Sequence, residues 1–585
     1  MTETRPTVAE AQSWRPEALA DLAEAWDRAA GGVQIHLDEA AREVLGTGEF
    51  WTGSAADEAR ATIAEITTPG RHAARALIAA AAAARSGAPR IAAAREQVLD
   101  AVAHARSLGY DVADDGTVTP PATIPDLLRL TCGGDDGVAR AMMQTRTTEF
   151  TATVVTALEQ LGAADRAAAG DIDAAFGTGE SGPAATTPAG AWSMTAAEAV
   201  AAWPVMSQDR IAAALAAMPE QQRLHLIETV PQQVGNTDGV PWPMRFAANR
   251  INVADAILAQ RRTVDMAEED KIRAVLGTLD AGSTERGWLA AHADPVFRAA
   301  LVADHDREAN ARIEFYESLL AEVPDPTTRT DDHLPRQIIA FDPDRSSFIE
   351  LSGDLTTATS VGVLVPGLGT TIAGSAADTE TSRRFVAAGN GAVAMITYLG
   401  GPFPDGALAA GLIDAGKATY AHDMAPRLVA FSEDVDRTVD ATGRDIPVTY
   451  IGHSYGGSIL GTAEFAGLTA DRTVYVAAAG AGVGVDSPDD WHNRNPEVVR
   501  FSMTAPGDWI QVVQGLMLSP HGADPDGMPG VVHLDTGRRL DGSPMMGPAA
   551  HSAVLNEPSD AWHNILAVIT GDWPALDVSG VERPA

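Results

Sequence analysis

Residues 447–462 read PVTYIGHSYGGSILGT and contain the pattern that decides the fold of the C-terminal part of the chain. A β-rich apolar run leads into G-H-S-Y-G at residues 452–456, and a helix-forming run follows. Strand, G-x-S-x-G and helix in this order are typical of a nucleophile elbow, a sharp turn that exposes a serine Oγ at the positive end of a helix. The alternative is a glycine-rich turn without chemistry. We predict Ser454 as a nucleophile.

Short β-rich runs lie on both sides of this motif, and several of them are apolar throughout, as in strands buried on both faces of a sheet. They are QIIAF (337–341), FIEL (348–351), VGVLV (361–365), AVAMITY (392–398), PVTYIG (447–452), RTVYVAAAG (472–480), VVRFSM (498–503) and VVHLD (531–535). Helical stretches, notably 416–439 and 458–468, lie between many of them. This alternation predicts a mostly parallel, doubly wound sheet and, with the elbow, an α/β-hydrolase fold.

The sequence before about residue 335 is alanine-rich and carries apolar residues at helical spacing, as in Leu19, Leu22 and Trp26. We therefore expect an all-α region before the hydrolase fold. The predicted domains are a helical hairpin with an added helix at 1–110, a mainly helical linker or cap region at 111–335, and the catalytic domain at 336–585. Asp115-Gly116 between β-formers predicts a small β-hairpin, and residues 181–190 read as a linker.

A serine hydroxyl needs a base, and the base needs an orienting acid. In this fold the chain order is serine, acid, histidine. Asp508 follows the run VVRFSM and is the predicted acid, and His551 follows VVHLD and is the predicted base. The alternatives are acids on the preceding loop and histidines that sit within a predicted strand, within a predicted helix or beside the serine. They are Asp486, Asp489 and Asp490, and His533, His563 (the second choice) and His453, to which we assign a supporting role.

The oxyanion that develops during acyl transfer needs hydrogen-bond donors, each worth about 3–4 kcal/mol. One predicted donor is the backbone N–H of Tyr455, directly after the nucleophile. The second is the N–H of Leu368, in the glycine-rich segment VPGLGT that follows the run VGVLV. This segment lacks G-x-G-x-x-G spacing, and the chain has no Walker lysine and no HExxH pair. We expect neither a cofactor nor a catalytic metal.

Composition narrows the class of protein further. With 42 Lys and Arg against 79 Asp and Glu, the net charge is −37, which disfavours nucleic acids and anionic membrane surfaces as partners. The longest apolar run, Ala76–Ala84, is far shorter than the ~20 residues that span a bilayer. Cys132 is the single cysteine, so no intrachain disulfide is expected. The first residues, MTETRPTVAEAQSW, predict no Sec-type signal peptide.

Four segments together resemble an actinobacterial α/β-hydrolase family known mainly as a domain of unknown function, DUF1023. They are VGVLVPGLGT, YIGHSYGGSILGTA, TAPGDWI and HSAVLNEP, and the segment VGNTDGVPWPMRFAANRINV (234–253) resembles one that precedes the core in that family. The likeness covers about residues 205–572 and implies a fold and a triad without a substrate. The segment after His551 departs from the family by lacking aromatic residues.

The N-terminal region has a resemblance of its own. Phe50-Trp51-Thr52-Gly53, between two predicted helices, is similar to the W-x-G turn of the WXG100 helical hairpins exported by type VII secretion systems. This implies a helical-hairpin or secretion-system partner for residues 1–110. The letters of Y-x-x-x-D at Tyr110–Asp114 match an export signature, although they fall in the predicted β-turn. We therefore expect the protein in the cytoplasm or exported by a type VII-like route.

These observations predict a serine hydrolase that acts on carboxylic esters. Trp509–Leu518 and Pro544–Met546 are apolar and Met-rich, so they could line a pocket for lipid or acyl groups or could be ordinary core. An acyltransferase with the same triad is an alternative within enzymes. The alternative outside enzymes is a secretion-associated binding or scaffold protein with a hydrolase-like domain.

Overall fold

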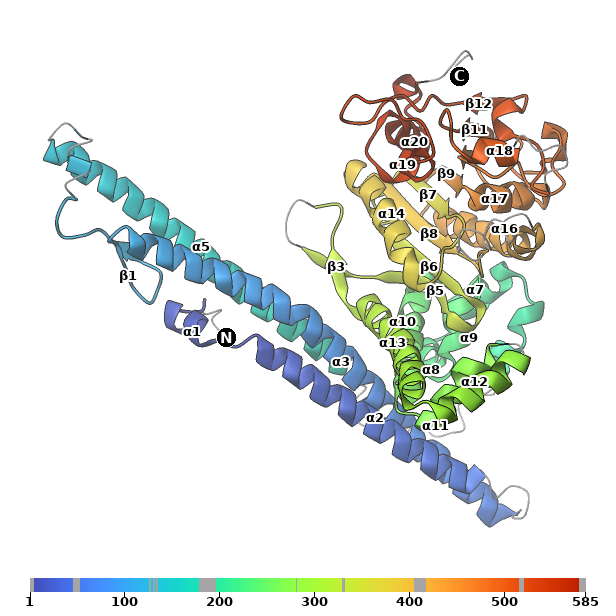
Figure 1. Ribbon diagram of the computed structural model, residues 1–585, viewed down its shortest axis with the longest axis horizontal. Coiled ribbons are helices and arrows are strands. Elements are labelled where there is room, and N and C mark those ends of the chain that lie inside the picture. The colour runs from blue at the N-terminus through green and yellow to red at the C-terminus, as the bar shows by residue number, and fades with distance from the viewer. Residues whose placement is uncertain are drawn as a thin grey trace. The chain divides into compact units, whose positions relative to one another are not determined.

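The computed structural model describes residues 5–45, 53–125, 128–129, 132, 135–177, 196–279, 281–328, 332–404, 417–514 and 520–577 (Figure 1). The chain forms two compact units, one of Met1–Ala189 with Ile257–Glu322 and one of Gly190–Ala256 with Val323–Ala585. The packing therefore groups residues 190–256 with the C-terminal sheet, whereas the sequence placed them in a linker or cap region. Phe50-Trp51-Thr52 and the linker 181–190 lie outside the described residues.

The first unit is built from helices. They are α1 (Val8–Ser13), α2 (Glu17–Leu45), α3 (Ser54–Ser107), α5 (Asp136–Gly177), α11 (Glu268–Gly277), α12 (Ala281–Ala293) and α13 (Pro295–Leu320). Apolar side chains at helical spacing, such as Val98, Val154 and Leu158, form a core between α3 and α5. Strands β1 (Asp111–Val112) and β2 (Val118–Thr119) pair antiparallel, as the Asp115-Gly116 turn predicted. The all-α character expected before the hydrolase fold is confirmed.

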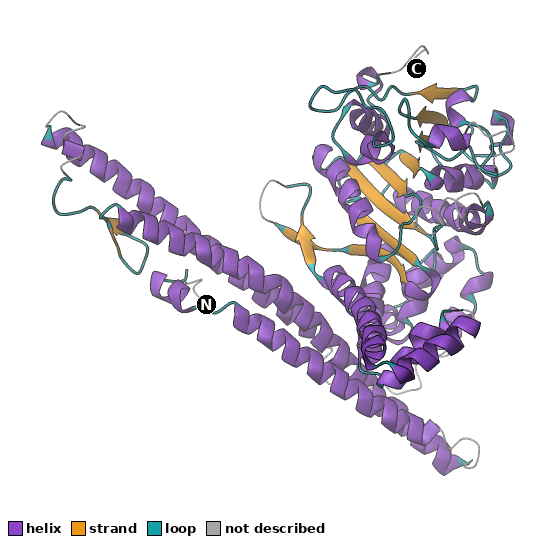
Figure 2. Ribbon diagram, viewed as in Figure 1, coloured by secondary structure: helices purple, strands orange, loops and turns teal. Residues whose placement is uncertain are grey.

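The second unit contains an eight-stranded sheet in the order β12-β11-β10-β9-β7-β8-β6-β5 (Figure 2). The strands are β5 (Gln337–Asp342), β6 (Ser347–Ser352), β7 (Ser360–Val365), β8 (Val393–Leu399), β9 (Val448–His453), β10 (Arg472–Val476), β11 (Val499–Met503) and β12 (Val531–His533). β6 is the one strand of this sheet that runs in the direction opposite to the other seven. All eight predicted runs are strands of one mostly parallel sheet. Before it, β3 (Glu322–Pro324) and β4 (His333–Pro335) form a two-stranded sheet.

Helices cover both faces of the sheet, as a doubly wound fold requires (Figure 1). They are α14 (Ala376–Ala388), α16 (Thr419–Asp440), α17 (Tyr455–Phe465), α18 (Ile510–Gln514), α19 (Ala550–Asn556) and α20 (Asp560–Thr570). On one face Phe385 of α14 stacks on Trp562 of α20, with ring centroids 4.6 Å apart, and both belong to the main hydrophobic core. Single 3₁₀ turns are η2 (Trp203–Val205), η3 (Pro343–Arg345), η4 (Ala373–Ser375), η5 (Pro488–Asp490), η6 (Pro525–Gly527) and η7 (Trp573–Ala575).

Residues 196–256 cover the edge strand β5. Their helices are α6 (Ala196–Ala201), α7 (Gln208–Ala216), α8 (Glu220–Thr229), α9 (Pro231–Asn236) and α10 (Trp242–Val264). The Asn236 amide donates to the Phe341 carbonyl (3.1 Å) and accepts from the Phe341 N–H (2.9 Å). Arg245 donates to the Ile339 carbonyl (2.8 Å), and Asn249 donates to the Ile338 carbonyl (3.1 Å), both earlier in β5. Because an open edge exposes unpaired backbone groups, these side chains close the sheet at β5.

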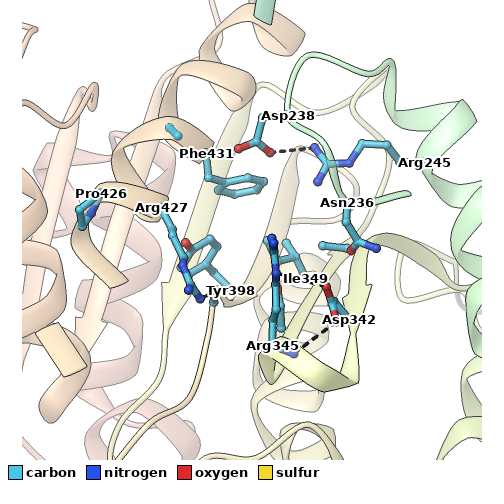
Figure 3. A pocket seen from close by; sticks show the side chains of 14 residues that line it. Asn236, Asp238, Arg245, Asp342, Arg345, Ile349, Tyr398, Pro426, Arg427 and Phe431 are labelled. Atoms are coloured by element: carbon cyan, nitrogen blue, oxygen red, sulfur yellow. Dashed lines mark hydrogen bonds and ion pairs between the residues drawn. The ribbon is translucent and has the colours of Figure 1, made fainter. Parts of the chain in front are cut away.

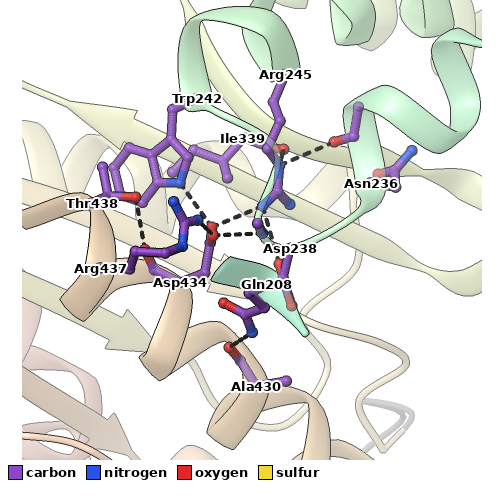
Figure 4. Close-up of polar contacts among 12 residues, drawn as sticks. Gln208, Asn236, Asp238, Trp242, Arg245, Ile339, Ala430, Asp434, Arg437 and Thr438 are labelled. Carbon is purple, nitrogen blue, oxygen red and sulfur yellow. Dashed lines mark hydrogen bonds and ion pairs between the residues drawn. The ribbon is translucent and has the colours of Figure 1, made fainter. Parts of the chain in front are cut away.

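A buried cluster of ion pairs and hydrogen bonds connects the segment 196–256 to α16 (Figure 4). Asp434 has no solvent exposure, and its carboxylate accepts from the Gly239 N–H (2.8 Å), the Trp242 indole (2.8 Å) and Arg245 (2.9 Å). Arg437, one turn further along α16, pairs with it as well. A buried charge is tolerated only when it is paired and hydrogen-bonded, and this one is surrounded by donors.

No helix among the described residues is long and apolar enough to cross a membrane.

Candidate active site

Ser454 lies between β9 and α17, at the centre of the sheet order. Its backbone has φ 55° and ψ −120°, a conformation that costs a non-glycine residue on the order of 1–3 kcal/mol. The turn is sharp enough that a Cβ on Gly456 would come within 2.1 Å of the Val365 carbonyl oxygen. The glycine in this position lets α17 pass directly over the end of β7, and the serine is left at the apex of the turn.

The structure brings Ser454, His551 and Asp508 into one hydrogen-bonded chain. His551 Nε2 is 3.0 Å from Ser454 Oγ, and His551 Nδ1 is 3.0 Å from each carboxylate oxygen of Asp508. The residues are 5%, 8% and 2% exposed, respectively, so solvent screens these contacts little. An Nδ1–H held by the carboxylate leaves Nε2 as the acceptor for the serine proton.

Asp508 and His551 come from two different connections at the same end of the sheet. Asp508 follows β11, and its carboxylate also accepts from the Ile510 N–H (3.0 Å). His551 stands in the first turn of α19, whereas the sequence placed it on a loop. The sequence AHSAVLN has no helix breaker, so the helix begins directly after Gly547-Pro548.

The alternative acids and histidines make other contacts. Asp490 closes the local η5 turn, where it accepts from the backbone N–H of Ser487 (2.8 Å), and Asp486 and Asp489 are exposed. His533 contacts Asp526 (3.4 Å), and His563 contacts the Ser559 carbonyl one turn back in α20 (2.7 Å).

Two neighbours hold His551 in place. His453 Nε2 is 2.8 Å from the His551 carbonyl oxygen, so this ring nitrogen donates to the backbone of the histidine. Burial, and then the nearby His551, lower the pKa of His453 to about 4, which keeps its ring neutral. The Trp509 ring lies 4.6 Å from the His551 ring, centroid to centroid. The contact of His453 agrees with its expected supporting role. Trp509 was expected only as a pocket-lining residue. Its position directly after Asp508 in the sequence could have indicated that it lies beside the histidine.

The loop after β7 lies against the serine. A Cβ on Gly367 would be 2.9 Å from Ser454 Cβ, and Leu368 follows directly. Gly369 N–H donates to the Pro404 carbonyl (2.9 Å), which fixes the far side of this loop. Tyr455 is the first residue of α17, so its N–H has no acceptor within the helix. Both predicted oxyanion donors are therefore close to the serine in the chain or in space, and their roles stay predictions.

A second serine–histidine pair lies one turn further along α17. Ser458 Oγ is 2.9 Å from His521 Nδ1, and both residues have no solvent exposure. Ser458 lies inside the helix, without the elbow that raises Ser454. This pair therefore offers an internal comparison for the chemistry of Ser454.

Within the described ranges, no group of three or more His, Cys, Asp or Glu side chains is arranged to hold a metal ion.

A comparison with protein families agrees with the fold. Residues 342–518 match a family model described as alpha/beta hydrolase, a range that includes Ser454 and Asp508 and ends before His551. Searches of the curated proteins and of the solved structures gave no match. The narrower resemblance to DUF1023 and that to WXG100 proteins stay predictions. Residues 342–518 thus belong to an α/β-hydrolase domain, which contains the eight-stranded, mostly parallel sheet.

Proposed function

We propose that the protein hydrolyses carboxylic esters through an acyl-enzyme, with Ser454 as nucleophile, His551 as general base and acid, and Asp508 as the group that orients His551. The observation that carries this proposal is the chain of contacts from Ser454 Oγ to His551 Nε2 (3.0 Å) and from His551 Nδ1 to Asp508 (3.0 Å). It supports the proposal because it starts at a strained, elbow-mounted serine.

In the first half-reaction, Ser454 Oγ attacks the ester carbonyl carbon while its proton passes to His551 Nε2. The carbonyl oxygen becomes an oxyanion, for which the N–H groups of Tyr455 and Leu368 are the proposed donors. His551 then gives its proton to the leaving alkoxide, the ester C–O bond breaks, and an alcohol departs. Asp508 stabilises the imidazolium throughout without taking its proton.

In the second half-reaction, water attacks the acyl-Ser454 carbonyl and loses a proton to His551 Nε2. Collapse of the tetrahedral intermediate returns that proton to Ser454 Oγ and releases the carboxylic acid. An acyltransferase would differ only here, with an alcohol in place of water.

The acyl group that the site accepts is less constrained. Met545 and Ile510, from the two segments expected to line a pocket, are buried, Met545 in the main core and Ile510 in a small cluster with Ala477 and Ala479. Trp509 contacts the His551 ring, and Met546 is 54% exposed. Residues 515–518 lie outside the described ranges. Trp509 and Met546 are therefore the proposed apolar contacts for a lipid or acyl chain.

Turnover of 4-nitrophenyl acetate and 4-nitrophenyl octanoate tests the proposal. We expect release of 4-nitrophenol and of free acid. Formation of a new ester when an alcohol is added would favour the acyltransferase. Absence of any turnover by folded protein would contradict both enzymes and favour the scaffold protein.

The proposed partner of residues 1–110 is tested separately by cell fractionation. Export directed by this region predicts that deletion of residues 1–110 retains the protein in the cytoplasm. Failure to find the intact chain outside the cell would contradict it.

A further inference from the structure

A cavity of about 310 Å³ lies at the outer part of the sheet, away from the serine (Figure 3). Its walls come from the end of β5, the start of β6, the end of β8 and from α16, with Asn236 and Arg245 at one side. Because β5 and β8 both end here, the cavity is at the carboxyl edge of the sheet, where open α/β sheets bind ligands. β8 is two strands from β9, about 10 Å at the spacing of neighbouring strands.

The strongest indication of a ligand is the hydroxyl group of Tyr398. This side chain lines the cavity, is 1% exposed, and has no hydrogen-bond partner among the described residues. Gly400 leaves room for it, since a Cβ there would be 2.1 Å from the hydroxyl oxygen. Burial raises the pKa of Tyr398, so the hydroxyl keeps its proton and can donate. Unlike that of Tyr450, this hydroxyl is not fully enclosed, so it is accessible from the cavity that its side chain lines.

Arg427 supplies a positive charge next to this hydroxyl (Figure 3). One of its nitrogens donates to the Gly400 carbonyl (2.9 Å), and no carboxylate of the described residues lies within ion-pair distance of it. The opposite wall carries Arg345, whose guanidinium is 3.7 Å from Asp342.

The other charges of the cavity neutralise one another. Asp238 pairs with Arg245 (3.0 Å), and Arg245 in turn belongs to the buried cluster around Asp434 and Arg437. Among the described lining residues, once these pairs and Arg345–Asp342 are counted, Arg427 is the charge that has no opposite partner. The chain has a net charge of −37, so a cavity with a surplus positive charge has the opposite sign to the protein as a whole.

The rest of the wall is mixed, with the polar side chains of Asn236 and Ser347 beside apolar ones. Phe431 packs on Tyr398, with ring centroids 5.1 Å apart and planes tilted by 35°, and Ile349 and Pro426 complete the surface. Polar and charged groups set among apolar and aromatic side chains in a cavity of this volume are compatible with a small-molecule site. Asp238 and Asp342 are paired with arginines, so the donors Arg427 and Tyr398 remain for a ligand, and they suit an anionic acceptor.

We propose that this cavity binds a small organic carboxylate, with the carboxylate on Arg427 and the Tyr398 hydroxyl and a compact apolar body against Phe431 and Ile349. The site is separate from the serine and does not depend on the proposed ester hydrolysis. Its ligand class follows from one guanidinium, one unpartnered hydroxyl and an aromatic wall.

Calorimetric titration of the full chain with benzoate and hexanoate, each compared with its neutral amide, tests this inference. We expect at least one carboxylate to bind, about tenfold or more tighter than its amide, with affinity that falls as salt is added. Arg427→Gln and Tyr398→Phe should each weaken binding about tenfold, because each removes a donor to a charged acceptor. Tyr398→Phe keeps the ring, and Arg427→Gln loses one hydrogen bond of the described residues, to the Gly400 carbonyl, so both should fold.

Matched controls are available for both variants. Tyr450 is also buried with an unpartnered hydroxyl but does not line the cavity, and Arg273 is an exposed arginine of the other unit. Tyr450→Phe and Arg273→Gln should bind the carboxylate as the wild type does. The inference is overturned if neither carboxylate binds better than its amide, if Arg427→Gln and Tyr398→Phe bind normally, or if the controls lose affinity equally.

Discussion

Asp508 and Asp434 are both buried carboxylates of the second unit, and they differ in what surrounds them. Asp434 is enclosed by an indole, a backbone N–H and two guanidinium groups, and these contacts connect its helix, α16, to α10. Asp508 has the Ile510 N–H and the His551 ring, and that ring reaches a serine. A carboxylate saturated by permanent charges holds a structure together, whereas one whose partner can gain a proton can assist chemistry.

Substitutions at the two carboxylates should therefore have different effects: those at Asp508 should lower kcat, and those at Asp434 should lower the free energy of unfolding. The largest effect concerns the end of the Asp508 chain. Ser454→Ala should lower kcat by about 10⁶-fold, because the nucleophile is lost, with the thermal unfolding temperature nearly unchanged. Ser458→Ala, in the second serine–histidine pair, should retain most of the turnover in the same ester assay. Equal losses in the two variants would contradict the assignment of Ser454.

Asp508→Asn should lower kcat by about 10⁴-fold, since an amide favours the wrong tautomer of His551. The measurement is single-turnover and steady-state ester hydrolysis at neutral pH. Asp490→Asn, an acid of the preceding loop with only local bonds, is the control and should keep its activity. Normal turnover by Asp508→Asn would show that another group orients the histidine.

Asp434→Ala should have the opposite profile. Its removal leaves Arg245 buried at 1% exposure with one carboxylate fewer, and breaking such a pair costs about 3–5 kcal/mol of unfolding free energy. Urea unfolding would measure this loss, with kcat of the folded fraction nearly unchanged. Asp436→Ala, on the exposed side of the same helix, should change stability by less than about 0.5 kcal/mol. A large loss of kcat in Asp434→Ala without a loss of stability would contradict the structural role assigned to Asp434.

His453 predicts a smaller, pH-dependent effect. Its pKa of about 4 in the folded protein lies below the ordinary value of 6.5, so the unfolded chain binds a proton more readily between these values. Stability therefore falls as the pH drops from 6.5 towards 4, by at most about 3 kcal/mol from this group. Glutamine can donate to the His551 carbonyl but does not titrate, so His453→Gln should show a shallower acid loss in urea unfolding. Identical slopes in both proteins would contradict the assignment.

Local patterns in the sequence were sufficient to predict the strands of the sheet and the order of the candidate site residues along the chain. Strands buried on both faces are short apolar runs, and the elbow has a spacing that sterics impose, so Ser454 could be located directly. Asp508 and His551 followed from their places after successive strands. Helix α19 was missed because Gly547-Pro548 before His551 reads as a loop, and the turn signal outweighed the short helical run behind it.

The contacts of residues 234–253 could not be predicted from the sequence. Asn236 and Arg245 bind strand β5 about a hundred positions further along the chain, and Asp434 is nearly two hundred positions from its partners. In the sequence, Asp434 is one of several acids in an amphipathic helix, and nothing in its spacing distinguishes it from Asp436. Such pairings depend on the tertiary fold, which periodicity does not report.

Labelling with a fluorophosphonate probe, followed by peptide mass mapping, tests whether Ser454 is an activated nucleophile, because the probe reacts with activated serines. We expect a single adduct on Ser454 in the wild type and in Ser458→Ala, and none in Ser454→Ala. Folded wild-type protein without label, or with label on Ser458, would contradict the proposal that the chain from Asp508 through His551 activates Ser454.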